Sequence, residues 1–93
     1  MGIHDNFVVF HNANPKVYWE LVRLAKEAKT NGHQKIGIGM LWEVMRWNLF
    51  YQKNDPNSEF KLNNNYRSRY ARFVMDTNPD LVGLFETREL KSP

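Results

Sequence analysis

The chain has 93 residues, no cysteine and a formal net charge of +3 at pH 7, with a sequence pI of about 9.3. This length has room for one hydrophobic core, so we expect a single domain over residues 1–93 without a deep cofactor cavity. The absence of cysteine excludes disulfides, thiolate nucleophiles and thiolate metal sites. No signal-peptide pattern and no apolar run of about 20 residues is present, which predicts a soluble, cytoplasmic protein.

The first predicted elements are a short strand over residues 6–10 and a helix from Pro15 to about Asn31. Asn-Phe-Val-Val-Phe at 6–10 is a β-prone apolar run. Asn14 is expected to cap the helix, Pro15 suits its first position, and Gly32 is a strong stop signal. The apolar stripe of this helix recurs at three- and four-residue steps and consists of Val17, Tyr18, Leu21, Val22, Leu24, Ala25 and Ala28.

The middle of the chain predicts a very short strand over residues 35–39 and then a helix from Met40 to about Gln52. Apolar and aromatic side chains spread around this second helix, so we expect it to be central and wrapped on several sides. Of the three tryptophans, two are expected in the core and one partly exposed. The inner stripe of the helix is predicted to be Leu41, Val44, Met45 and Leu49.

The C-terminal part predicts a turn over 53–58, a short strand over 59–62, a third helix over 66–76 and a closing strand over 85–90. A single helical turn over 80–84 precedes the closing strand. The fold class that follows is α+β, a small three-helix domain with short antiparallel strands.

The third helix carries the best candidate site. At about 100° per residue, Tyr66, Tyr70, Phe73 and Val74 share the inner side. The opposite side holds arginine forks, an amide and a hydroxyl, which are the groups that contact phosphates and base edges. These outward residues are Asn65, Ser68, Arg69, Arg72 and Asp76, with Arg67 on the flank beside Val74. An ordinary solvated face, with arginines paired to nearby acids, is the competing interpretation.

The order helix, strand 35–38, helix, strand, arginine-bearing helix 66–76 and closing strand 85–90 resembles a winged helix-turn-helix domain. In that family the last helix of the bundle is the recognition helix and the following strands form a wing. The resemblance implies that Asn64, Asn65, Ser68, Arg69 and Arg72 face a DNA groove and that Arg88 lies in the wing. The blocks 40–44 and 61–66 also resemble small uncharacterised proteins of phages and bacteria, which implies no established activity.

These patterns predict a small DNA-binding protein with a regulatory or accessory role and no catalytic activity. Arg67, Arg69 and Arg72 would contact phosphates and bases, and Lys61, Arg88 and Lys91 would add flanking phosphate contacts. A two-fold homodimer would be usual on DNA, although no helix or heptad pattern stands out as set aside for dimerisation. The alternative is a protein–protein interaction module, such as a phage-encoded modulator of a host protein, because aromatic residues and arginine dominate interface hot spots.

Enzyme and metal chemistry find little support in the sequence. No nucleophile elbow, phosphate-binding glycine loop or dinucleotide fingerprint is present. His4, Asp5 and His11 lack the fixed spacing of known metal sites, and His33 follows the helix-ending Gly32 in a predicted loop. We therefore expect no cofactor and no metal.

Overall fold

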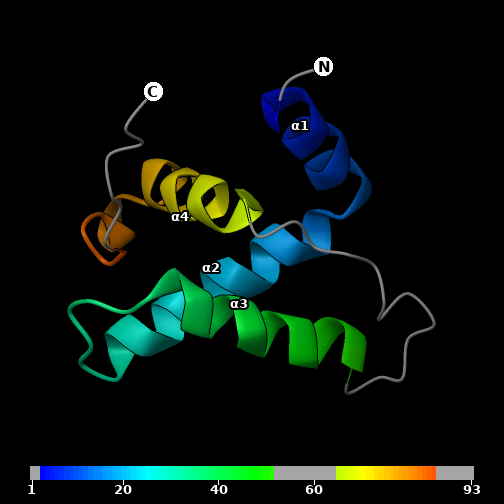
Figure 1. Cartoon of the computed structure of the whole chain (residues 1–93). Coiled ribbons are helices and arrows are strands. Elements are labelled where there is room, and N and C mark those ends of the chain that lie inside the picture. Colours follow the sequence, from blue (N-terminus) through cyan, green and yellow to red (C-terminus); the bar gives the residue numbers. More distant parts are fainter. Residues whose placement is uncertain (1–2, 52–64, 86–93) are drawn as a thin grey trace.

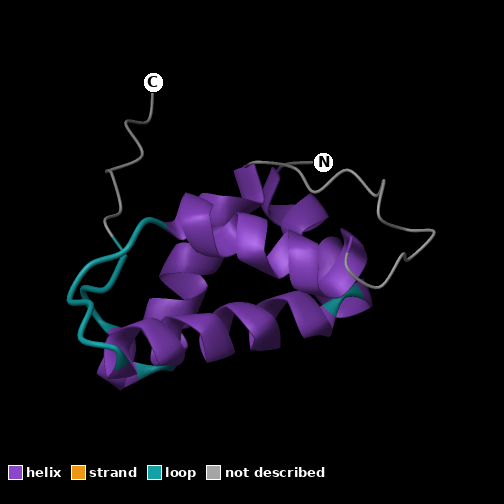
Figure 2. Ribbon diagram, turned by 90° about the horizontal axis from the view of Figure 1, so that it is seen from below, coloured by secondary structure: helices purple, strands orange, loops and turns teal. Residues whose placement is uncertain are grey.

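The computed structural model describes residues 3–51 and 65–85, with side chains described from residues 7 and 66 onward in these two ranges. Every regular element in these ranges is helical, and none is a strand (Figures 1 and 2). The predicted α+β fold with antiparallel strands is therefore wrong. In chain order the elements are α1 (Ile3–Ala13), α2 (Pro15–Thr30), α3 (Ile38–Arg46), the π-helical segment η1 (Trp47–Tyr51), α4 (Asn65–Thr77) and the 3-10 turn η3 (Pro79–Leu81).

Helix α2 is the central helix, and it packs against α1, α3 and α4. Its buried residues are the seven that the periodicity predicted, from Val17 to Ala28. Charged residues occupy most of the other positions, so the helix has one apolar side with which it packs against its neighbours. The expectation that the aromatic helix after residue 40 would be central is wrong.

The proline and glycine signals at the two ends of α2 are confirmed, but the side-chain cap predicted for Asn14 is wrong. Pro15 occupies the first turn after Asn14, but the Asn14 side chain makes no cap hydrogen bond and instead donates from Nδ2 to the Phe10 carbonyl at 3.1 Å. At the other end Gly32 has a φ of 95°. The His33 amide donates to the Ala28 carbonyl at 3.1 Å, and the Gly32 amide donates to Lys29 at 3.0 Å. This pair of bonds is a Schellman motif, in which a left-handed glycine satisfies the last carbonyls of the helix.

Residues 6–10 lie in helix α1, so the strand predicted there is wrong. Phe7 and Phe10 are buried, whereas Val8 and Val9 are exposed. The Phe7 ring packs edge-on against Tyr70 with centroids 4.8 Å apart, and the Phe10 ring lies 4.9 Å from Tyr66. These contacts require the three-residue spacing of a helix, because a strand would turn Phe7 and Phe10 to opposite faces.

The other predicted strands are absent from the described ranges or lie outside them. Residues 35–37 are irregular and α3 begins at Ile38, so the strand over 35–39 is wrong. The Ile36 amide donates to the Leu84 carbonyl at 2.9 Å and ties this irregular segment to the chain after η3. Phe85 is buried in a bend, and the predicted strand residues 59–62 and 86–90 lie outside the described residues.

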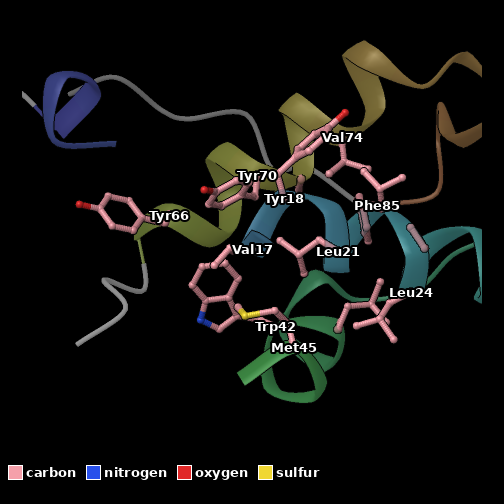
Figure 3. Close-up of a cluster of buried hydrophobic side chains, with 14 of the residues drawn as sticks. Val17, Tyr18, Leu21, Leu24, Trp42, Met45, Tyr66, Tyr70, Val74 and Phe85 are labelled. Carbon is pink, nitrogen blue, oxygen red and sulfur yellow. The ribbon is translucent and has the colours of Figure 1, made fainter. Parts of the chain in front are cut away.

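The core is one cluster that draws residues from α1, α2, α3 and α4 and from the segment after η3. Figure 3 labels members from α2, α3, α4 and Phe85 of the segment after η3. Trp42, Met45 and Tyr70 are fully buried at its centre, where α3 and α4 meet α2. In α4, Tyr66, Tyr70 and Val74 are buried as predicted, and Phe73 packs partly buried against the cluster.

Candidate functional site

The arginines of α4 do not form one surface. Arg69 and Arg72 lie on the outward side with exposed Ser68, as the helical spacing predicts, and both arginines are half-buried. Arg67 is half-buried on the inner flank. Its Nη1 lies 3.5 Å from the place that a Cβ on Gly39 would take, so it reaches across to the first turn of α3.

The remaining predicted nucleic-acid contacts fall outside the described side chains. Asn65 is the first residue of α4, and only its backbone is described. Lys61, Asn64, Arg88 and Lys91 lie outside the described residues. Residues 3–51 and 65–85 contain no strand, so no wing of antiparallel strands lies in these ranges. The closing strand predicted over 85–90 falls outside them except for Phe85.

A second surface lies on the side of α3 and η1 that faces away from the core. Four large apolar side chains lie there with exposed fractions of 64% for Met40, 36% for Val44, 58% for Trp47 and 44% for Tyr51. They follow one another at steps of four, three and four residues, so they lie one above the other along the helix. We call these four residues the outer stripe. Figure 1 shows α3 along the lower edge of the molecule.

The opposite side of the same helix is also apolar. Leu41, Trp42, Met45 and Phe50 are buried on it. The side of a surface helix that faces water is normally polar, whereas α3 and η1 carry large apolar side chains on both sides. The outer stripe is therefore the main unpartnered apolar surface of the described part of the chain.

Polar groups beside the outer stripe hold it in a defined shape. The Arg46 guanidinium donates from Nη2 to the Tyr51 hydroxyl at 2.7 Å and lies 5.4 Å from the centre of the Tyr51 ring. The same side chain pairs with Glu43 at 3.2 Å. The Tyr51 ring is thus fixed by a hydrogen bond and a cation–π contact, and the charges of Glu43 and Arg46 cancel locally.

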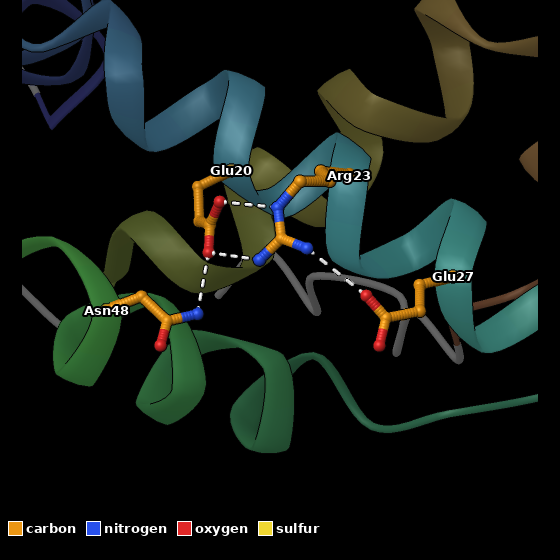
Figure 4. Close-up of polar contacts among 4 residues, drawn as sticks. All are labelled: Glu20, Arg23, Glu27 and Asn48. Atoms are coloured by element: carbon orange, nitrogen blue, oxygen red, sulfur yellow. Dashed lines mark hydrogen bonds and ion pairs between the residues drawn. The ribbon is translucent and has the colours of Figure 1, made fainter.

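The π-helical segment η1 is anchored to α2 by a polar network (Figure 4). Asn48 donates from Nδ2 to a carboxylate oxygen of Glu20 at 2.7 Å. Glu20 also accepts two bonds from Arg23, at 2.8 and 2.7 Å, and Arg23 pairs with Glu27 at 3.2 Å. The hydrogen bond to Glu20 raises the pKa of Arg23. Short π-helical segments are rare and occur frequently at functional sites.

The sequence analysis assigned Val44 and Trp42 to the wrong sides of α3, and these two residues determine which side of the helix is exposed. Val44 was expected in the inner stripe but is exposed, and Trp42 lies in the core instead. Of the three tryptophans only Trp42 is buried, while Trp19 and Trp47 are exposed, so the expectation of two core tryptophans is wrong. The four-three-four spacing of the outer stripe was present in the sequence, and it is the seam pattern of packed helices.

Of the candidate metal ligands, His11 and His33 have described side chains, whereas the side chains of His4 and Asp5 lie outside the described ones. His11 Nδ1 lies 3.2 Å from the Tyr70 hydroxyl, and its ring contacts Phe7, Tyr18 and Phe73. His33 lines an open pocket of about 400 Å³ between the end of α2 and the segment after η3. The amine of Lys29, in the same pocket, donates to the Asp80 carbonyl. Within the described ranges, no three acidic or histidine side chains are grouped to hold a metal ion.

Comparison of the chain with protein-family models, with curated proteins and with solved structures gave no match. Among the helices that the structure describes, none is long and apolar enough to cross a membrane.

Proposed function

We propose that this chain is a protein-binding module whose docking surface is the outer stripe of α3 and η1. The observation that carries the proposal is the placement of four large apolar side chains on the solvent side of a helix whose other side is already in the core. Their exposed area is roughly 400 Å², taking ordinary side-chain areas, which is the size of patch that on monomers is often functional.

The chemistry of the outer stripe suits a protein partner better than a nucleic acid. Platforms for single-stranded nucleic acid combine stacked aromatics with cations that follow the phosphates. Here Trp47 has the aliphatic neighbours Met40 and Val44, and the adjacent cation, Arg46, is already paired with Glu43. Trp and Tyr in an apolar setting are the residue types that dominate protein interface hot spots.

Photo-crosslinking in the source cells tests this function. A photoreactive phenylalanine analogue is placed at position 40 in the outer stripe and, as the matched control, at position 26 on exposed α2. We expect a discrete protein adduct from position 40, none from position 26, and loss of that adduct when Trp47→Ala is added. Absence of an adduct at position 40, or the same adduct from position 26, would overturn the proposal.

The Trp47→Ala variant must keep its fold for the crosslinking test to be informative. Trp47 is exposed, so we expect Trp47→Ala to change the free energy of unfolding by no more than about 0.5 kcal/mol. Urea unfolding followed by circular dichroism measures this. Val44→Ser is a second variant on the same stripe that removes less surface and should weaken the adduct in the same direction.

Nucleic-acid binding through α4 is the second candidate function. It is supported by the outward positions of Ser68, Arg69 and Arg72 on one helix side and by the basic pI. The test is fluorescence anisotropy with a labelled random duplex at low and moderate salt, since phosphate contacts weaken steeply as salt rises. Arg69→Ala with Arg72→Ala is expected to abolish binding, whereas the charge-matched Lys26→Ala with Lys35→Ala is not. Equal affinity in both double variants would exclude this site.

A further inference from the structure

The spacing of the outer stripe reads the same in both directions along the helix. Met40, Val44, Trp47 and Tyr51 are separated by four, three and four residues. If two such helices lie antiparallel about a two-fold axis between Val44 and Trp47, every member of the stripe meets a member of the other stripe. Isologous contacts in two-fold dimers have this property, because residue i contacts j and j contacts i.

We infer that the partner of the outer stripe is a second copy of this chain, bound antiparallel through α3 and η1. This inference rests on the proposed protein-binding function and names its partner. In the antiparallel arrangement Trp47 lies opposite the small Val44 of the second copy, and Met40 lies opposite the flat ring of Tyr51. Large against small is the arrangement that lets two helix surfaces interdigitate. A parallel pair would instead place Trp47 against Trp47 and Val44 against Val44.

The electrostatics of this surface permit self-association. A face that carries one sign of charge repels its own copy, but Glu43 and Arg46 beside the outer stripe form an ion pair at 3.2 Å. These two residues add no net charge to the surface, so they do not contribute to repulsion between two copies of a chain with a net charge of +3. Tyr51 is already held by Arg46 through its hydroxyl, so docking it loses less side-chain freedom than docking a mobile ring.

The exposed area sets the expected strength of the dimer. The outer stripe offers roughly half of the ~800 Å² per partner that a standard interface buries, and flanking side chains must supply the rest. Weak and transient complexes lie at the low end of the range of interface areas. We therefore expect a dissociation constant on the order of micromolar. The dimer should therefore be visible at tens of micromolar and dissociate on dilution.

Sedimentation equilibrium of the full chain measures this directly. We expect the weight-average mass to rise from the monomer value of 11.1 kDa toward twice that value between about 1 and 200 µM. Trp47→Ala should raise the dissociation constant at least tenfold and Val44→Ser should raise it less. Trp19→Ala, which removes an equally exposed tryptophan from α2, is the matched control and should leave the dimer intact.

Cysteine trapping determines the direction of pairing, and it is clean because the chain has no cysteine of its own. A mixture of the variants Met40→Cys and Tyr51→Cys, both of which keep Trp47, should form a mixed disulfide faster than either variant forms a disulfide with itself. The reason is that the antiparallel seam brings residue 40 opposite residue 51 of the second copy, within the Cα separation of up to about 7 Å that a disulfide needs. Lys26→Cys, on exposed α2, is the control for random collision.

The outcomes separate this inference from the proposed function. A concentration-dependent dimer that needs Trp47, together with the mixed disulfide, supports the second copy. A monomer at 200 µM, a dimer indifferent to Trp47→Ala, or preferential trapping of Met40→Cys with itself overturns the inference. In each of these cases the protein-binding function still stands if position 40 gives a Trp47-dependent adduct to a different protein in the source cells.

Discussion

Alkaline pH should destabilise this protein through one buried hydroxyl. Tyr70 is fully buried, packed between Phe7 and Trp42, and its hydroxyl lies 3.2 Å from His11 Nδ1. Burial raises the pKa of Tyr70 well above its ordinary value, with a smaller contribution from nearby Tyr66. The phenolate form is disfavoured because the core cannot solvate it.

The sign of the effect follows from proton counts. In the unfolded chain Tyr70 ionises near pH 10, whereas in the folded chain it stays protonated to higher pH. Between these two values the folded chain binds one more proton than the unfolded chain, so stability falls as pH rises. The free energy of unfolding should lose about 1.4 kcal/mol for each pH unit above ~10 from this group alone. Below pH 10 both states are protonated, and the group contributes no pH dependence.

Urea unfolding of the wild type and of Tyr70→Phe between pH 8 and pH 11 tests this. At pH 8 the variant should be less stable by about 1 kcal/mol, because it loses the bond to His11. At pH 11 that difference should shrink or reverse by about 1.4 kcal/mol, since only the wild type carries the ionising hydroxyl. Tyr51→Phe, which alters an exposed ring, is the control and should follow the wild type. Parallel curves for wild type and Tyr70→Phe would refute the reasoning.

Two further predictions concern the backbone and the core. Gly32→Ala should destabilise the protein by about 1–2 kcal/mol in thermal unfolding, because Gly32 has a φ of 95°. Gly37→Ala, at an ordinary φ with open space around it, should cost less than about 1 kcal/mol, because it loses only the preference for glycine over alanine at the start of α3. Trp42 is fully buried and its Nε1 has no hydrogen-bond partner, so Trp42→Phe should stay within about 1 kcal/mol of wild type, because removal of the unmet donor offsets the lost volume. A loss of about 3 kcal/mol or more in urea unfolding, as expected for Trp42→Ala, would contradict this account of Trp42→Phe.

The sequence predicts an element well where its apolar residues point in one direction. Helix α2 has a single stripe, a proline at its first turn and a glycine after its end, and its bounds and buried residues follow these signals. Helix α4 behaves in the same way on its inner side, with Tyr66, Tyr70 and Val74 buried. In both helices charged or polar residues on the opposite side exclude other orientations.

The errors arise where local pattern and tertiary packing disagree. The run from Phe7 to Phe10 is short and β-branched, and such a run cannot be distinguished from a buried helical segment by periodicity alone. The aromatic rings of α4 favour the helix over the strand, because they pack against Phe7 and Phe10 on one side of α1. Residues 35–39 alternate like a strand, but no described segment offers an edge with which they could pair.

Helix α3 was predicted as a helix, but its orientation could not be read from its residues. Val44 and Trp42 point to different sides, and a sequence that is apolar on both sides fits two rotations equally well. The core selects the rotation that buries Trp42 against Tyr70, with ring centroids 5.9 Å apart, and this choice turns Val44 and Trp47 outward. The apolar residues on both sides of α3 make its rotation unpredictable from the sequence, and the same residues form the exposed outer stripe. Apolar side chains on both sides of α3 are what the proposed docking of the outer stripe requires, because the water-facing side of a surface helix is normally polar.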